Sequence, residues 1–241
     1  MIDLFAYLLG TGFPLVMVIT FLIGINQSNI NDLLKRKYSI GLIVLTVLWV
    51  LTVWILAVAG LFEYQSGDPI PRFLAGLLFP VLIGIWLFRK VVFQEILNAT
   101  PHYLIVGMQT LRILGISFLF LAHRGEGPIE FASAGYGDLI TGMLALIAGI
   151  LLYAEKRNAA WSVILFNAAG LFDLLNVSRI LLLYYPSWYS GHPSTQVAGQ
   201  YPTVLILCIA APIALMFHFY SIREMIKTWG RKEHEVHKIQ G

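Results

Sequence analysis

The chain alternates seven long apolar runs with short polar segments along almost all of its 241 residues. Each run is close to the length of about 20 residues that an α-helix needs to cross the hydrocarbon core of a bilayer. The runs are continuously apolar rather than alternating, which favours helices over membrane-spanning strands. The predicted spans are residues 4–25, 39–62, 73–90, 101–122, 131–153, 160–185 and 201–226. The pattern therefore predicts an all-α, polytopic bundle of seven transmembrane helices, with residues 1–241 forming a single transmembrane domain.

Basic residues are distributed unequally between the two predicted faces, and this bias predicts the orientation. With the N-terminus outside, only Arg72 and Arg124 lie on the outer face. The inner face receives Lys35, Arg36, Lys37, Arg89, Lys90, Lys156, Arg157, Arg223, Lys227, Arg231, Lys232 and Lys238. Because Lys and Arg concentrate on the cytoplasmic side of membrane proteins, we expect the N-terminus outside and the C-terminus in the cytoplasm. Residues 227–241 then form a basic cytoplasmic tail.

The composition agrees with a membrane protein. Hydrophobic residues make up 58% of the chain and charged residues only 12%, about half the usual charged share, so a soluble surface could not be covered. The single cysteine, Cys208, excludes a disulfide within one chain and gives no support for a cysteine metal site. The net charge of +3 is spread over loops and a short tail. We therefore expect the lipid bilayer as partner, and no nucleic acid.

Four ionisable side chains lie inside the predicted spans, namely Arg112, Asp138, Asp173 and Arg179. A charge at bilayer depth costs roughly 2.5 kcal/mol or more unless it is paired or hydrated. At 1.5 Å per residue, Arg112 and Asp173 fall near the middle of their spans and Asp138 lies about 6 Å further outward. Gln109 lies one turn inward of Arg112 on the same face. These charges point to the region of a site.

Two interpretations of the four charges remain open. In the functional one, they line a polar pocket that opens outward and binds a small polar or ionic ligand or relays protons. In the structural one, Arg112 pairs with one of Asp173 and Asp138, and Arg179 pairs with the other acid. The cancelling formal charges and the matched depths suit the structural interpretation, and the two roles can coexist.

Span six carries a polar residue or a glycine at every third position through its middle, at Asn167, Gly170, Asp173, Asn176 and Arg179. Asn176 and Arg179 lie about 5 and about 9 Å outward of the midplane. Positions three apart share a helix face that drifts slowly around the axis. The series predicts a polar ribbon across most of the bilayer, either as a hydrated lining or as a set of interhelical hydrogen bonds.

His218 lies in span seven, about 7 Å inward of the midplane. His218 can be interpreted in three ways: as a histidine that only packs in the core, as a proton-responsive group, or as a haem ligand together with His102. The last is disfavoured because His102 lies about 15 Å inward, so the two imidazoles differ in depth. We predict no cofactor, no metal site and no catalytic residue. The candidate ligand-binding residues are Gln109, Arg112, Asp138, Asn167, Asp173, Asn176, Arg179 and His218.

The motifs between residues 100 and 225 carry a resemblance. They are Gln109-x2-Arg112-x2-Gly115, Ala134-Gly135-x-Gly137-Asp138 with Phe131, Gly142 and Ala145, Asn167-x2-Gly170-x2-Asp173, and Pro202 with Pro212 and His218. Together they resemble a family of uncharacterised bacterial seven-span integral membrane proteins. The resemblance implies a location in the bacterial inner membrane, and it implies no particular activity.

Three functions are compatible with the sequence. The first is a membrane protein that binds a small polar ligand or ion between spans four and seven, for transport or sensing. The second is a non-catalytic accessory subunit of a membrane complex, in which the four charges hold the helices together. The third is a haem or redox membrane protein. No hydrolase, P-loop or zinc-protease signature is present, so the sequence gives no support for an enzyme.

Overall fold

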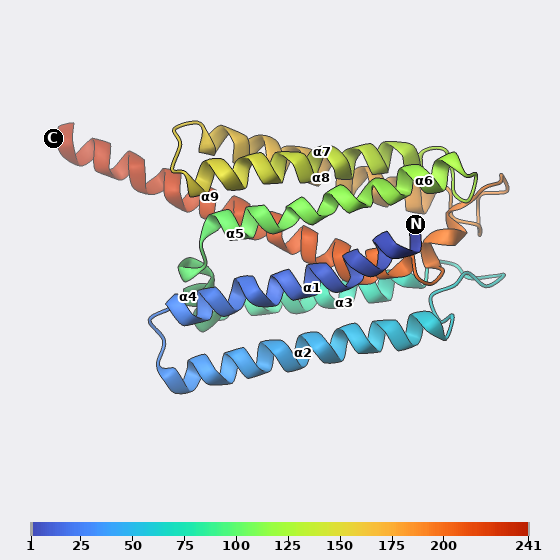
Figure 1. Cartoon of the computed structure of the whole chain (residues 1–241), viewed down its shortest axis with the longest axis horizontal. Helices are drawn as coiled ribbons and strands as arrows, with labels where there is room; N and C mark the ends of the chain where they lie inside the picture. Colours follow the sequence, from blue (N-terminus) through green and yellow to red (C-terminus); the bar gives the residue numbers. More distant parts are fainter. Residues whose placement is uncertain (1, 241) are drawn as a thin grey trace.

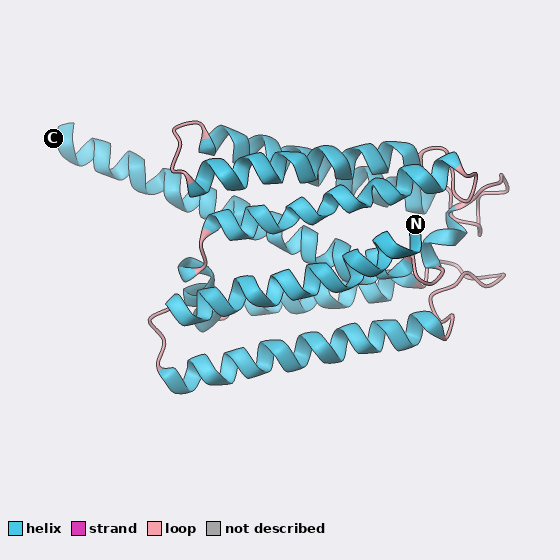
Figure 2. Cartoon of the chain, in the orientation of Figure 1, coloured by secondary structure: helices cyan, strands magenta, loops and turns pink. Residues whose placement is uncertain are grey.

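The computed structural model describes the backbone of residues 2–240 and the side chains of residues 2–228. Figure 2 shows helices joined by short loops, and no strand occurs in this described part of the chain. The all-α class predicted from the apolar runs is therefore confirmed.

The first half of the chain forms four helices (Figure 1). They are α1 (Ile2–Gln27), α2 (Asp32–Val58), α3 (Phe73–Phe88) and α4 (Val91–Ala99). Asn31 begins α2 by accepting a hydrogen bond from the Leu34 backbone N–H at 2.8 Å. The chain bends by 93° between α3 and α4, so α4 turns across the end of the bundle.

The second half holds the remaining spans. Span four consists of α5 (His102–Gly107), the 3₁₀ helix η1 (Met108–Ile116) and α6 (Ser117–His123). It is followed by α7 (Phe131–Tyr153), α8 (Ala159–Leu183), the 3₁₀ turn η2 (Thr195–Gly199), the π-helical turn η3 (Ile206–Ala210) and α9 (Ala211–Gln240). The predicted tail lies at the end of α9, and its side chains from residue 229 onward lie outside the described residues.

Six helical segments of the described chain are long and apolar enough to cross a membrane. The number becomes seven if the bent pair α3 and α4 is counted as one span. Since α3 alone is 16 residues, about 24 Å, it is shorter than the usual hydrocarbon thickness. The helices are compatible with a multi-pass membrane protein, and the seven-span count stays a prediction.

Glycines on α7 allow it to pack backbone to backbone against span four. A Cβ at Gly135 would lie 2.6 Å from the Leu119 nitrogen, and one at Gly142 would lie 2.6 Å from the Ile113 nitrogen. Both distances are far too short for a side chain, so only glycine permits this approach. The close contact brings the polar residue between them, Asp138, directly beside span four.

A proline explains the π-helical turn at the start of the last span. Pro212 has no N–H to donate, and its ring would clash with the carbonyl four residues earlier in a regular α-helix. The chain widens to π-helix over Ile206–Ala210, immediately before this proline. The π turn thus opens the helix locally where the proline cannot continue the regular hydrogen bonding.

The first three helices differ in how much protein surrounds them. The most apolar window of α2 is 17% buried, as expected for a helix that faces lipid, whereas that of α1 is 44% buried. Figure 1 shows α1 between α2 and span four. Unlike α2, α1 is therefore part of the interior of the bundle, where its Leu9 and Phe13 side chains are buried.

Candidate functional site

Span four changes its winding where it carries its polar residues. In a 3₁₀ helix, side chains three residues apart eclipse one another. Gln109, Arg112 and Gly115 in η1 therefore form one line, and all three are buried. The Gln109 side-chain amide donates to the Ala214 carbonyl of α9 at 2.7 Å. This line faces the interior of the bundle.

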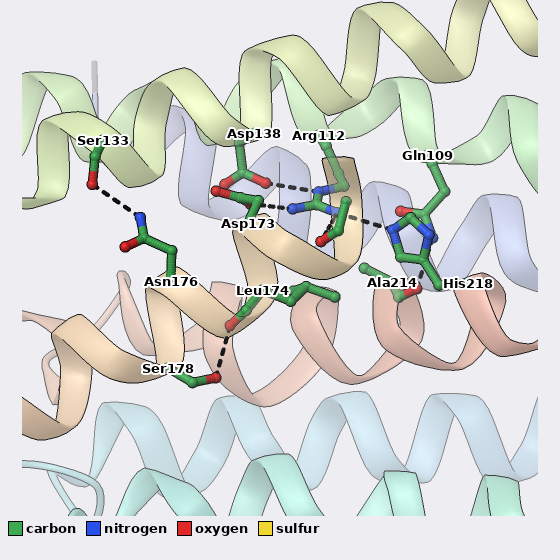
Figure 3. Close-up of polar contacts among 11 residues, drawn as sticks. Gln109, Arg112, Ser133, Asp138, Asp173, Leu174, Asn176, Ser178, Ala214 and His218 are labelled. Carbon is green, nitrogen blue, oxygen red and sulfur yellow. Dashed lines mark hydrogen bonds and ion pairs between the residues drawn. The ribbon is translucent and has the colours of Figure 1, made fainter. Parts of the chain in front are cut away.

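Arg112 binds side chains from three other helices (Figure 3). Its Nε donates to Asp138 Oδ1 of α7 at 2.7 Å, and its Nη2 donates to Asp173 Oδ2 of α8. Its Nη1 donates to His218 Nε2 of α9 at 3.1 Å and approaches the Gly170 carbonyl at 3.5 Å. Only 3% of the Arg112 side chain is exposed. A single guanidinium therefore joins span four to α7, α8 and α9.

The two carboxyl groups share one edge of this guanidinium. The Nε–H and one Nη2–H of arginine point in the same direction and commonly clamp both oxygens of one carboxylate. In this site each of the two N–H groups binds a different residue, Asp138 through Nε and Asp173 through Nη2. Asp138 and Asp173 consequently lie beside each other, although 35 positions separate them in the numbering.

Each acid lies against a glycine of the neighbouring helix. A Cβ at Gly115 would overlap the Asp138 carboxyl group, and a Cβ at Gly137 would overlap Asp173 Oδ1. The glycine that precedes Asp138 in sequence thus makes room for the other acid. The spacing of glycine and acid in these motifs has a steric reason, since any side chain at either glycine would displace a carboxyl group from Arg112.

The imidazole of His218, which belongs to α9, likewise lies against a glycine of a neighbouring helix, Gly170 of α8. A Cβ at Gly170 would overlap this ring, and the ring stacks on Phe166 with centroids 4.7 Å apart. Arginine is only a donor, so Nε2 of His218 must accept from Arg112 and the ring proton must lie on Nδ1. His218 is therefore neutral in this arrangement, with Nδ1 donating to Asn167 Oδ1 at 3.0 Å.

A further chain of hydrogen bonds leads from His218 along the bundle. Asn167 Nδ2 donates to Ser221 Oγ at 3.0 Å, and that hydroxyl lies 3.1 Å from Nε2 of His102. His102 is the first residue of span four. Both predicted histidines thus belong to one polar network, with both nitrogens of His218 engaged in it. Within the described residues, no group of three metal-ligating side chains occurs.

The outer part of the polar ribbon lies apart from the network. Asn176 donates to Ser133 Oγ of α7 at 2.9 Å (Figure 3). It also accepts a hydrogen bond from Arg179 at 3.1 Å. Arg179 is exposed and makes no ion pair with a described residue. The predicted pairing of Arg179 with an acid is therefore wrong. The ribbon turns out of the interior beyond Asp173, because positions three apart drift around an α-helix.

A cavity of 40 Å³ lies beside Arg112, Asp138 and Asp173. The rest of its wall is apolar and comes from α1, α6, α8, η3 and the start of α9. Leu9 and Phe13 of α1 contribute to that wall. The cavity is large enough for a water molecule, which needs about 10–15 Å³ measured in this way.

Several parts of this site were missed by sequence reasoning. Ser221 carried no signal beyond being a polar residue in an apolar run. Leu9 and Phe13 could not be distinguished from lipid-facing residues. The 3₁₀ winding of η1 was also not anticipated, although Gln109, Arg112 and Gly115 at spacing three fit a 3₁₀ period. Arg112 had been expected to pair with only one of Asp138 and Asp173, whereas in the structure it binds both.

The fold and the site are those of a helical protein compatible with a multi-pass membrane protein, with a buried polar centre between its spans. Residues 71–226, well over half of the chain, match the family described as a domain of unknown function (DUF8737). The chain belongs to this family. The match covers the elements from α3 to residue 226 of α9, and therefore all the polar residues of the site. Comparison with curated proteins and with solved structures gives no match.

Proposed function

We propose that this protein binds a small ion at the centre formed by Arg112, Asp138 and Asp173, as part of transport or sensing across the membrane. The observation that carries the proposal is an unequal charge count beside a cavity. One guanidinium faces two carboxyl groups, and the 40 Å³ space adjoins all three. A net charge in the bilayer interior is costly, so the centre favours an additional positive charge.

The size of the cavity favours an ion over an organic ligand. Sites for organic molecules usually measure about 300–1,000 Å³. Since a water molecule needs about 10–15 Å³ on the same measure, 40 Å³ is enough for a water molecule or a bare ion and too small for an organic ligand. The broader prediction of a small polar ligand is accordingly narrowed to an ion, with Gln109 and His218 orienting Arg112 and the adjoining helix.

The irregular helical turns support a mobile site. Two of the walls are the 3₁₀ helix η1 and the π turn η3. Such turns inside longer helices frequently mark hinges and functional positions, because their backbone hydrogen bonds rearrange at little cost. An ion that neutralises the centre would favour one arrangement of these turns, which is the coupling that transport and sensing both require.

The accessory-subunit function remains the second candidate, and one observation favours it. Arg112 is 3% exposed and is bound by acceptors from three other helices, an arrangement that is sufficient to hold the spans together without a bound ion. We regard a cofactor-free, non-enzymatic protein as the prediction for both candidates. The haem interpretation receives no support from His218, whose two ring nitrogens bind Arg112 and Asn167.

Cysteine accessibility tests the ion-binding proposal. Ala210 lines the cavity, so an Ala210→Cys variant in a Cys208→Ser background places a thiol in it. If ions enter and leave, a small cationic methanethiosulfonate reagent should label this thiol at a rate that changes with NaCl relative to choline chloride, or that changes with pH more than ionisation of the thiol itself accounts for. Ala148→Cys, at a buried position outside the cavity lining, is the control and should stay unlabelled. A cavity thiol that is never labelled in the folded protein would favour the accessory-subunit function.

We further propose the orientation with the N-terminus outside, in a bacterial inner membrane. The twelve-to-two bias of basic residues supports the orientation, and the motif resemblance supports the location. Reporter fusions test the topology directly. A fusion after residue 157 should report the cytoplasm and one after residue 195 the outside. A cytoplasmic result at residue 195 would contradict the seven-span arrangement.

A further inference from the structure

The identity of the bound ion follows from the groups that surround the two acids. Arg112 of η1 carries the one positive charge in contact with them. His218 of α9 is neutral because its Nε2 accepts from Arg112. Within the described residues, the cavity lining from α1, α6 and η3 contains no titratable side chain. With both acids ionised, the centre therefore has one negative charge in excess.

A metal cation is poorly suited to remove this excess. Hard cations such as Mg²⁺ and Ca²⁺ need six or more oxygen ligands. Apart from Asp138 and Asp173, no lining side chain offers an oxygen, since the remaining wall is aliphatic or aromatic apart from the Arg112 guanidinium and Gly115. A metal ion beside these acids would also lie close to the guanidinium, and like charges repel strongly at low dielectric constant. A proton needs no coordination shell and lowers the charge at the carboxyl group itself.

The arrangement of the two acids also favours a proton. Two carboxylates held side by side cannot both ionise easily, and acid pairs of this kind share one proton. In this centre the crowding is imposed by the guanidinium, whose two parallel N–H groups bind one oxygen from each acid. Arg112 balances one of the two negative charges, and the shared proton balances the other.

One oxygen atom is suited to carry the proton. Asp173 Oδ1 is buried and has no hydrogen-bond partner among the described residues. An ionised oxygen in that position would lack any compensating donor, which is costly, whereas a protonated one is neutral. The Asp138 side chain is 13% exposed, against 3% for Asp173, so Asp138 is the better site for the remaining charge.

We infer that the ion of the proposed site is a proton, one for the two acids, which is carried on Asp173 Oδ1 while Asp138 stays ionised against Arg112. This inference rests on the proposed function and names its ion. Binding transfers a proton from hydronium to the Asp173 carboxylate, giving a carboxylic acid and water, and release reverses the step. The reaction requires no other reactant, and the cavity is large enough for the water that delivers or accepts the proton.

Infrared spectroscopy of the purified protein tests the inference. At neutral pH the wild type should show the C=O stretching band of a protonated carboxylic acid, and exchange into D₂O should shift it. Raising the pH should remove the band reversibly. The Asp173→Asn variant should lack the band. Asp138→Asn should lack it too, because Asp173 then becomes the only counter-charge for Arg112 and ionises.

The isosteric Asp68→Asn variant is the matched control and should keep the band, since Asp68 lies in a loop outside the centre. The pH titration of the wild type needs no variant, so a folding defect in either Asn variant leaves the test intact. A wild type without the band at neutral pH would overturn the inference, and so would a band that survives both Asn substitutions.

Failure of the inference can be told apart from failure of the proposed function. If the band is absent while NaCl changes labelling of the Ala210→Cys thiol, the site binds a metal cation. The proposed ion-binding function then stands, and only the identification of the ion as a proton is contradicted. If the band behaves as expected while the cavity thiol is never labelled, the two acids hold a permanent proton. The inference of a proton on the two acids then stands, with a structural role for that proton, and the proposal of transport or sensing is contradicted.

Discussion

The chain contains two arginine–aspartate sites that use the same arginine atoms differently. In the loop before α3, Arg72 donates through Nε and Nη2 to the two oxygens of one carboxylate, Asp68, at 2.7 and 2.8 Å. Inside the bundle, Arg112 donates through the same two nitrogens to Asp138 and Asp173. The loop site is balanced in charge and partly exposed, with 34% of the Arg72 side chain accessible. The buried site has one carboxyl group too many.

This difference separates a contact that closes a loop from a centre that can bind an ion. A carboxylate paired with one guanidinium leaves no net charge to neutralise, and at an exposed site water and salt screen the remaining electric field. Two carboxyl groups on one guanidinium have a remaining charge, and the apolar surroundings do not screen it. The residue types are identical, so the distinction arises from the number of acids and their burial. Four predictions test this comparison.

The largest effect is expected for the Arg112→Gln substitution. It leaves two buried acids without their counter-charge, and breaking a buried ion pair typically costs about 3–5 kcal/mol. Thermal unfolding in detergent should show a large loss of Tm, partly recovered when Asp138→Asn and Asp173→Asn are added. Arg179→Gln, at an exposed arginine without an ion pair to a described residue, is the control and should change Tm little. Equal losses at both arginines would remove the basis of the comparison.

An intermediate effect is expected for Gly137→Ala. The added methyl group would overlap Asp173 Oδ1 and push this acid away from Arg112. Overpacking of this kind typically costs about 1–3 kcal/mol. The matched control is Gly41→Ala on α2, where a Cβ meets nothing within 4 Å. If Gly137→Ala is as stable as the control and keeps the infrared band, the fit of acid to glycine does not matter.

The two sites should respond to pH in opposite directions. If the two acids carry one proton in the folded protein, as we infer, the unfolded chain has lost that proton at neutral pH. The charged and titratable neighbours of the acids are Arg112, which contacts both, and neutral His218, which contacts Arg112. The stabilising contribution of the proton is therefore full at acid pH and is lost as pH rises, by about 1.4 kcal/mol per pH unit for one proton. Unfolding in detergent at a series of pH values should show this slope in the wild type and a flatter one in Asp173→Asn. The same slope in both proteins would contradict the shared proton.

At Asp68 the sign is reversed. Hydrogen bonds from Arg72 and from the Gln65 backbone N–H lower the pKa of this carboxyl group below its usual 3.8. A lowered pKa stabilises the folded protein at pH values above the usual pKa. This contribution is lost as the pH falls through the pKa that the group has in the folded protein.

The smallest effect is expected for Arg72→Gln, because the loop pair is exposed to water. Tm should fall slightly, and the fall should shrink as NaCl is raised from low ionic strength, since salt screens exposed charges. Arg112→Gln measured in the same salt series should show little dependence on salt. A salt-sensitive loss at Arg112 would mean that water reaches the buried centre freely.

Much of the fold was predictable because it depends on local composition. Apolar runs of sufficient length become helices in a bilayer, where the backbone must satisfy its own hydrogen bonds. The all-α class followed from that argument. The bend between α3 and α4 was not predicted, because it depends on how α4 packs against α1 rather than on hydropathy.

The site was predictable as a set of residue types and not as a geometry. Matched depth brought two arginines and two acids into one layer, but depth along a helix says little about rotation around it. Rotation places Asp173 inside and Arg179 outside, although they are only six residues apart on α8. The same limitation hid the link from Arg112 to His218, which requires the side of α9 that faces Gly170.

The sequence by itself determined that this chain forms apolar helices and that a few charges must be accommodated among them, since hydropathy and solvation energy are properties of the residues. Only the tertiary structure decided that Arg112 divides its N–H groups between Asp138 and Asp173. That division depends on helix rotation and on the close approach allowed by Gly115 and Gly137, which are set by packing between segments far apart in the chain. The excess of one carboxyl group, on which the proposed ion site depends, is a consequence of that packing.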